Sequence, residues 1–228
     1  MTKTTRNILI VTGVVALSVT IFFIFRKFSK GKSSSSMIPT IKDNQKNTLS
    51  NGIIVSIPST KFGKYDVLII WGGISYATPE WIYSQIPKEV LYTHIVVIAP
   101  YDVKLSTVES VYKPFLESNH YNENTINSVS LLGFSAGGYK VQENYSPKYK
   151  MVGLIDPSTK SNYVNLPFTK NTFIVYNDKN WTGSEGLVAI GKTLPLLGDS
   201  IARSGGVAER LNMKHADIPK YFFEKFLV

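Results

Sequence analysis

The chain has 228 residues, of which 43% are hydrophobic, and this is enough for one substantial domain. It has no cysteine, which excludes disulfides, thiol catalysis and thiolate metal sites. Its formal net charge is +9, but the basic residues are spread along the chain and form no stripe with interleaved aromatic residues, so we expect no nucleic-acid partner.

The first predicted element is an uncharged apolar segment, Ile8–Phe25. At a rise of about 1.5 Å per residue, a helix of this length spans a hydrocarbon core of about 30 Å. The segment runs directly into Arg26 and Lys27, without the small residues of a cleavage site, so we expect residues 1–28 to be an uncleaved membrane anchor. Slightly more basic residues follow the segment than precede it, which favours a single-pass protein whose following domain is cytoplasmic.

Residues 29–51 are rich in serine and lysine and are predicted to be a flexible tether, with an edge strand at most in its second half. The globular domain is predicted over residues 52–228. Short apolar runs in it predict strands, and segments with helical periodicity lie between most of them. The predicted strands are Gly52–Pro58, Asp66–Trp71, His94–Ala99, Ser128–Gly133, Met151–Asp156, Thr172–Asp178 and Val207–Leu211. The predicted helices are Pro79–Ile86, Ser106–Ser118, Ala136–Asn144, Ser184–Ser204, with a break or kink at Pro195, and Ile218–Phe226.

This alternation of strands and helices predicts an α/β domain with a doubly wound, mainly parallel sheet. The strands are apolar throughout their length, as expected when helices cover both faces of a sheet. In such sheets the ligand binds beyond the carboxyl ends of the strands. Residues that follow those ends are therefore the first candidates for a functional site.

One strand end carries a distinctive pattern, Gly133-Phe134-Ser135-Ala136-Gly137-Gly138. A sharp turn from strand to helix leaves no space for side chains at its flanks, which explains why glycine occupies positions 133 and 137. The same turn forces Ser135 into a strained conformation and exposes its hydroxyl above the sheet. The pattern matches G-x-S-x-G, the nucleophile elbow, and the helix that follows favours negative charge at its N-terminus.

With this elbow and the alternating elements, the segment from Gly52 to Val228 resembles the α/β-hydrolases, specifically their esterase and lipase branch. The resemblance implies the chain order nucleophile, acid, histidine. His215 is the only one of the three histidines that follows Ser135, and it occupies the loop where this family places its general base. For the acid, the resemblance favours Asp178, and Asp156 at the end of the preceding strand is the alternative.

The resemblance also implies an oxyanion hole made of two backbone N–H groups. One is expected from Ala136, directly after the nucleophile. The other is expected from the loop Trp71-Gly72-Gly73-Ile74, which is similar to the family's H-G-G-G loop. Trp71 replaces the usual histidine and Ile74 replaces a glycine, so the second donor is either Gly73 or Ile74.

These features predict a membrane-anchored serine hydrolase that cleaves carboxylic esters, with lipid or acyl esters among the substrates considered. The reaction needs no cofactor and no metal. Only about 15 residues, Pro157–Asn171, separate two of the predicted strands, so no large lid is expected there. The alternative is an inactive, membrane-tethered protein that kept the fold, which the altered Trp71–Ile74 loop and the two competing acids would fit.

Overall fold

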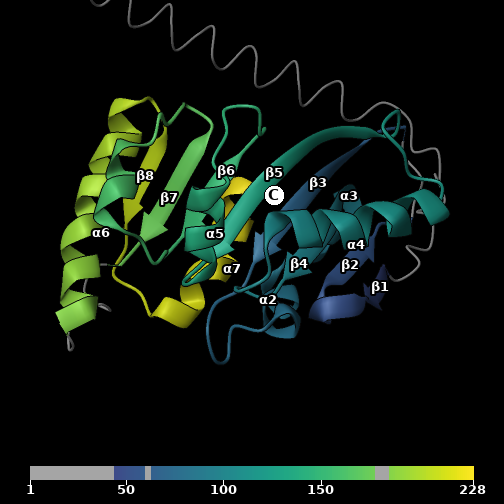
Figure 1. The fold of residues 1–228 in the computed structure, drawn as a ribbon, viewed down its shortest axis with the longest axis horizontal. Helices are drawn as coiled ribbons and strands as arrows, with labels where there is room; N and C mark the ends of the chain where they lie inside the picture. The colour runs from purple at the N-terminus through teal and green to yellow at the C-terminus, as the bar shows by residue number, and fades with distance from the viewer. Residues whose placement is uncertain (1–43, 60–62, 178–184) are drawn as a thin grey trace, which may run out of the picture. The chain divides into compact units, whose positions relative to one another are not determined.

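The computed structural model describes residues 44–59, 63–177 and 185–228 (Figure 1). The predicted anchor Ile8–Phe25 lies outside these residues, as does the predicted acid Asp178. Across the described ranges, no helix combines the length and the apolar character needed to cross a bilayer.

An eight-stranded sheet forms the centre of the domain, with strand order β1-β2-β4-β3-β5-β6-β7-β8. β1 pairs with β2 and β2 with β4 in antiparallel fashion, and every pairing from β4 to β8 is parallel. The predicted mainly parallel sheet is therefore confirmed. The strands are β1 (Gln45–Thr48), β2 (Ile54–Ile57), β3 (Tyr65–Trp71), β4 (His94–Ala99), β5 (Ile126–Phe134), β6 (Val152–Ile155), β7 (Thr172–Tyr176) and β8 (Val207–Arg210).

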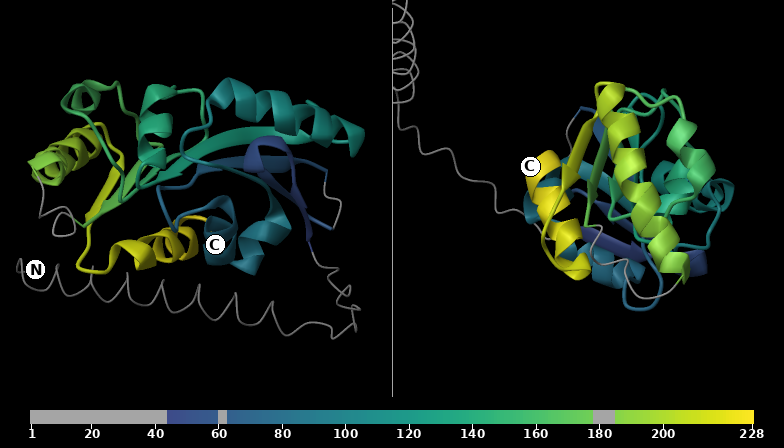
Figure 2. Two further views of the ribbon diagram at one scale, coloured as in Figure 1. Left: turned by 60° about the horizontal axis from the view of Figure 1, so that its bottom comes forward. Right: turned by 90° about the vertical axis from the view of Figure 1, so that its left-hand side faces the viewer.

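Helices cover both faces of the sheet (Figure 2). One face carries α4 (Leu105–Ser118), α5 (Gly137–Glu143) and α6 (Glu185–Arg203), and the other carries α2 (Pro79–Gln85), α3 (Lys88–Thr93) and α7 (Ile218–Phe226). α6 continues through Pro195. Between β6 and β7 the chain forms only the 3-10 turn Ser161–Asn165, so this connection holds no large lid.

The central strands are apolar because both of their faces are buried. In β3, Val67, Ile69 and Trp71 pack into the core under α4 to α6, whereas Leu68 and Ile70 pack into the core under α2, α3 and α7. β4 divides its side chains between the two cores in the same alternating way. A strand that buries every side chain needs a continuous apolar run, which is the pattern that the sequence shows.

Candidate active site

The candidate site lies at the edge of the sheet where the parallel strands end. β3, β5, β6 and β7 are neighbours and run in the same direction. The loops after these strands carry Gly73 and Ile74 (after β3), Ser135 (after β5) and Asp156 (after β6). The loop between β8 and α7 carries His215. The topology thus brings residues from four distant parts of the chain to one edge.

Ser135 occupies a sharp turn between β5 and α5, with a left-handed backbone φ of 52°. A residue other than glycine in this region costs about 1–3 kcal/mol and persists only where its surroundings hold it. Here the Ser135 N–H donates to the Ile155 carbonyl at 3.1 Å. The Ser135 carbonyl accepts from the N–H groups of Gly138 at 2.9 Å and Ser158 at 2.8 Å. These three hydrogen bonds fix the strained turn that the elbow pattern predicts.

The glycines of the elbow are sites of close backbone approach. A Cβ on Gly133 would lie 2.4 Å from the Gly137 carbonyl oxygen, and a Cβ on Gly137 would lie 2.4 Å from the Gly72 oxygen. A Cβ on Gly73 would lie 2.9 Å from the Cβ of Ser135. No real Cβ is found this close to backbone atoms. The absence of side chains at these positions therefore lets the loop after β3 lie directly against the nucleophile's turn.

His215 pairs with Asp156. Its Nδ1 lies 2.5 Å from Oδ2 of Asp156, whose side chain is fully buried. A carboxylate can only accept, so Nδ1 carries the hydrogen and the lone pair of Nε2 is left for a proton. The second carboxylate oxygen, Oδ1, accepts from the backbone N–H of Asn177 at 2.9 Å. Asp156 itself has a left-handed φ of 39°, a strained conformation at the end of β6.

The sequence favours Asp178 as the acid, but in the described structure His215 is hydrogen-bonded to the alternative acid, Asp156. Both residues follow the carboxyl ends of adjacent parallel strands, so both are at the correct edge. Asp178 lies outside the described residues. Among the described residues, Asp156 is thus the acid that contacts Nδ1 of His215.

The imidazole of His215 also stacks on Phe134, the residue before Ser135. The two ring centroids are 4.5 Å apart and the rings are inclined by 29°. About a quarter of the His215 side chain is exposed, whereas Phe134 is fully buried. The stacking places the imidazole beside the turn that carries Ser135, and part of the ring stays open to solvent.

Gly73 and Ile74, the two candidates after β3 for the second oxyanion donor, differ in whether their N–H groups already have an acceptor. The Gly73 N–H donates to the Ala77 carbonyl at 3.0 Å and is therefore engaged within its own loop. Within the ranges that the structure describes, the N–H groups of Ile74 and Ala136 meet no acceptor. These two remain for an oxyanion. Trp71, which replaces the family's histidine, is buried and donates from Nε1 to the Val103 carbonyl at 2.9 Å, anchoring the loop.

Two buried amides at the site were not found from the sequence. Gln142 of α5 donates from Nε2 to the carbonyls of Gly138 at 2.7 Å and Ser158 at 2.9 Å, and its Oε1 accepts from Thr159 at 2.6 Å. It thereby ties the nucleophile's helix to the loop that follows Asp156. Asn177 is the second. No motif marks either residue, and only the position of Asn177 directly after an apolar strand signals its place at this edge.

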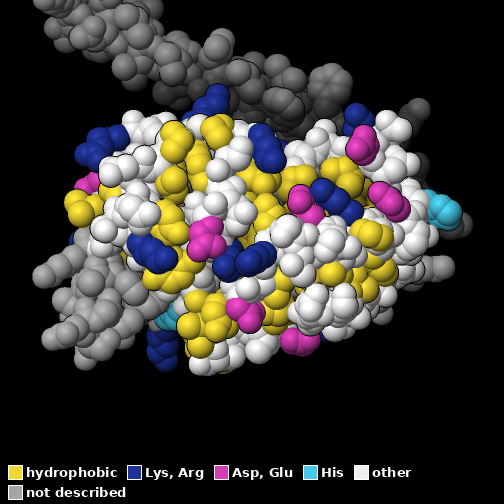
Figure 3. Space-filling model, viewed as in Figure 1, with side chains coloured by type: hydrophobic (Ala, Val, Ile, Leu, Met, Phe, Trp, Pro, Cys, Tyr) yellow, Lys and Arg dark blue, Asp and Glu magenta, His cyan; other side chains and the backbone are white. Residues whose placement is uncertain are grey.

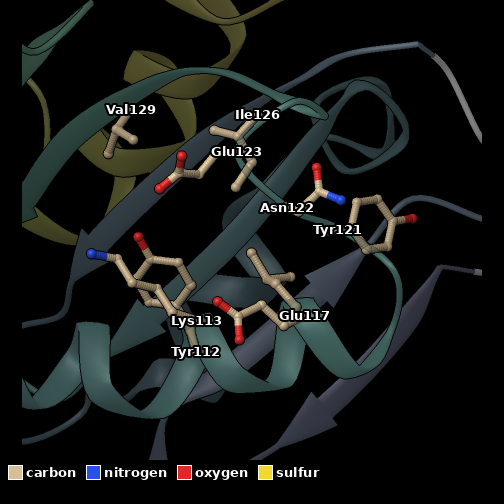
Figure 4. A pocket seen from close by; sticks show the side chains of 9 residues that line it. Tyr112, Lys113, Glu117, Tyr121, Asn122, Glu123, Ile126 and Val129 are labelled. Atoms are coloured by element: carbon tan, nitrogen blue, oxygen red, sulfur yellow. The ribbon is translucent and has the colours of Figure 1, made fainter.

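A separate cavity of about 350 Å³ lies at the opposite end of β5 (Figure 4). It is lined by residues of α4, of the segment between α4 and β5, and of β5 itself: Tyr112, Lys113, Leu116, Glu117, Tyr121, Asn122, Glu123, Ile126 and Val129. β5 starts at this cavity and ends beside Ser135, about 26 Å away at about 3.3 Å per residue. Burial raises the pKa of Tyr121 to about 12, so it lines the cavity as a neutral phenol. In the part of the chain that the structure describes, no group of three or more histidine or acidic side chains is placed to hold a metal ion.

No protein-family model and no curated protein sequence matches the chain. Among solved structures, it is similar to an uncharacterised protein from Capnocytophaga ochracea DSM 7271, with 10% identity and a TM-score of 0.52. That match covers 80% of this chain and 62% of the other, so the chain spans less than two thirds of that protein.

Two further similar structures are of hydrolases. The esterase Pf2001 of Pyrococcus furiosus is 12% identical, with a TM-score of 0.49 and coverage of 81% of this chain and 88% of the other. The sugar hydrolase YeeB of Lactococcus lactis is 19% identical, with a TM-score of 0.48 and coverage of 75% and 83%. Sheet order, parallel pairing and the strained elbow after β5 together show that the chain has the fold of the α/β-hydrolase superfamily.

Proposed function

We propose that the chain is a serine hydrolase of carboxylic esters, with Ser135 as nucleophile, His215 as general base and Asp156 as the acid. The observation that carries the proposal is the hydrogen bond from His215 to buried Asp156, at the same sheet edge as a serine held in a strained elbow. A glycine-rich turn with an incidental serine has no need of a buried acid–histidine pair beside it.

In the proposed reaction, Oγ of Ser135 attacks the ester carbonyl while Nε2 of His215 takes its proton. Asp156 keeps the imidazole in the required tautomer and stabilises the imidazolium that forms. The N–H groups of Ile74 and Ala136 hold the negative oxygen of the tetrahedral intermediate. His215 then gives the proton to the departing alcohol, and water releases the acid from Ser135 by the same steps.

A fluorophosphonate probe tests the proposal, since it reacts only with an activated serine. The full chain in detergent should be labelled, and Ser135→Ala and His215→Ala should abolish or nearly abolish labelling. Ser135→Ala should also lower ester turnover by a factor on the order of 10⁶. Two controls should keep the label: Ser110→Ala, an exposed serine of α4, and His120→Asn, in which asparagine tolerates the left-handed φ of 65°.

Absence of labelling in a folded parent chain would overturn the proposal. The chain would then be best described as an inactive protein with the hydrolase fold. Labelling that survives in Ser135→Ala would instead place the nucleophile elsewhere.

We further propose that Ile8–Phe25 anchors the chain in a membrane, with the hydrolase domain on the cytoplasmic side. The support is the uncharged length of the segment and the excess of basic residues after it. Protease added to the outside of intact cells should leave the domain uncut, and protease added to inverted vesicles should digest it. Digestion from the outer face would reverse the orientation, and recovery of the full chain in the soluble fraction would exclude the anchor.

A further inference from the structure

The loop that follows β3 carries an unusual pair of exposed apolar side chains. Ile74 is 57% exposed and Tyr76 is 48% exposed. Five large hydrophobic residues are exposed among those that the structure describes, and the other three are Tyr101, Leu196 and Val228. Two of the five thus lie on the loop after β3, which packs against the turn that carries Ser135. Figure 3 shows hydrophobic side chains over much of this face, including its lower edge, where Figure 1 shows α2.

The backbone of this loop is closed at its base. The Gly73 N–H donates to the Ala77 carbonyl at 3.0 Å and closes a small loop with Ile74, Ser75 and Tyr76 at its tip. Ser75 has a left-handed φ of 64°, and Ala77 is buried at the base of the loop. The tip of the closed loop thus presents Ile74 and Tyr76 to solvent.

Tyr76 belongs to a row of aromatic rings that reaches the catalytic base. Its ring meets Trp81 edge to face, with centroids 5.1 Å apart, and Trp81 stacks on Phe134 at 5.6 Å. Phe134 in turn stacks on His215. Burial, followed by the charges of Asp156 and Asp217, raises the pKa of Tyr76, which agrees with a position near the acid. The row thus connects the exposed loop to His215 through the buried ring of Phe134.

We propose that Ile74 and Tyr76 form a binding surface for an apolar substituent of the ester, which makes esters with longer hydrocarbon groups the better substrates. This inference rests on the proposed function. Ile74 would serve twice, since its N–H is one of the two proposed oxyanion donors and its exposed side chain adds apolar surface on the same loop. An apolar group placed there covers two exposed hydrophobic side chains, which is the usual source of binding free energy for such groups.

The test follows acid release from two series of esters, using the full chain in detergent. The acyl series is ethyl acetate, butyrate and hexanoate, and the alcohol series is ethyl, butyl and hexyl acetate. In the parent chain, kcat/KM should rise about two- to fourfold per added methylene in one of the series, and that series identifies which side of the ester is bound. Ile74→Ser and Tyr76→Ser should reduce this dependence on chain length, and the double variant should remove most of it.

Leu196→Ser is the matched control, because Leu196 is 56% exposed but belongs to α6. It should keep the parent's chain-length dependence. A parent with no dependence in either series, or a dependence that survives in the double variant, would overturn the inference. Fluorophosphonate labelling separates this failure from that of the proposed function, because a labelled Ser135 with no chain-length preference leaves the hydrolase intact.

An independent observation concerns Asn177, which directly follows β7 and is 3% exposed. Its backbone N–H donates to Oδ1 of Asp156 at 2.9 Å, and its Nδ2 donates to the Met213 carbonyl at 2.5 Å. Met213 lies two residues before His215. One buried residue therefore contacts the acid with its main chain and the loop of the base with its side chain. The geometry points to Asn177 as a positioning residue that sets the distance between Asp156 and His215.

Asn177→Asp tests this role, because it keeps the shape and the backbone N–H but removes the side-chain donor at neutral pH. We expect kcat to fall about 10- to 100-fold while KM changes by less than about twofold. Losses of this size are typical when a residue that hydrogen-bonds to a functional group, and so holds its orientation, is replaced. Protonation of the new carboxyl restores a donor toward Met213, so the activity of the variant relative to the parent should rise as the pH falls. Asn119→Asp is the control, since Asn119 donates to the Phe115 carbonyl at 2.8 Å at the far end of α4. A variant that melts earlier but keeps the parent's kcat and pH profile would overturn the assignment.

Discussion

At the scale of single residues, most of the residues with a strained backbone lie at the candidate active site. Five residues other than glycine have a positive φ among those described, and three of them, Ser75, Ser135 and Asp156, are at the carboxyl edge of the sheet. Each such residue costs about 1–3 kcal/mol, which the surrounding structure must offset. In the proposed mechanism the strain has a use at two of these positions, since it exposes Ser135 as the nucleophile and aims Asp156 at His215. The third strained residue, Ser75, lies at the tip of the loop after β3.

The identity of the acid gives a direct prediction. Asp156→Asn keeps the side-chain shape but no longer holds His215 in the tautomer that accepts a proton on Nε2. By analogy with the serine protease triad, ester turnover should fall by a factor on the order of 10⁴, while the folded structure is kept. Asp178→Asn should retain far more activity than Asp156→Asn. Steady-state kinetics of the two variants decide the question, and a larger loss in Asp178→Asn would return the role to the acid that the sequence favoured.

At the scale of elements, the sequence predicts best where burial is complete. His94–Ala99 is predicted with the same bounds as β4, because a strand buried on both faces leaves a continuous apolar run. α3 was not predicted, since its six residues contribute only Val90 and Leu91 to the core and no helical period is visible. β1 is polar and exposed at the sheet edge, and only its pairing with β2 makes it a strand. The helix predicted from Ser106 begins one residue earlier, at Leu105.

The same reasoning explains the partial success at the site. The elbow and His215 follow from motif and chain order, which are local or sequential properties. The choice between Asp156 and Asp178 depends on which carboxylate points at Nδ1 of His215. Both acids follow the carboxyl end of a parallel strand, so the sequence pattern does not distinguish them. The choice between Gly73 and Ile74 depends on a single hydrogen bond to Ala77, which no sequence pattern encodes.

An ion pair at the amino end of β3 gives a prediction at this scale. Burial tends to raise the pKa of Asp66, but hydrogen bonds from Lys150 at 2.5 Å, Ser128 at 2.5 Å and Asn127 at 2.9 Å outweigh it and lower the pKa. A lowered folded-state pKa stabilises the fold above the unfolded pKa of about 4 and loses this effect as the pH falls through the folded value. Asp66 thus links the start of β3 to β5 and to the segment before β6.

Asp66→Asn should therefore lower the free energy of unfolding by about 1 kcal/mol at pH 7, a modest value because Lys150 is half exposed. The difference from the parent should shrink at pH 3, where the carboxylate of the parent is being protonated. Urea unfolding at the two pH values measures both quantities. Asp199→Asn, at an exposed position of α6, is the control and should be neutral at both. An equal loss at pH 7 and pH 3 would mean that packing, and not charge, accounts for the effect.

At the scale of the whole molecule, the described structure is one sheet with two cores, and the site needs both. The elbow serine is held between α5 on one face and the loop that leads to α2 on the other, and His215 stacks on Phe134, which belongs to the core under α2, α3 and α7. Loss of packing on either face should therefore disturb the triad. This coupling makes activity a sensitive measure of whether the domain folds without the residues that precede it.

Lys42–Val228 forms a compact unit that contains every strand of the sheet. We predict that a fragment of these residues folds alone, with the same melting temperature and the same rate of fluorophosphonate labelling as the full chain in detergent. The reason is that all the described core and site contacts lie within the fragment. Circular dichroism on heating and a labelling time course measure the two properties. A fragment that melts earlier or labels more slowly would show that residues 1–41 add packing to the domain, and the anchor would then have a structural role as well as a topological one.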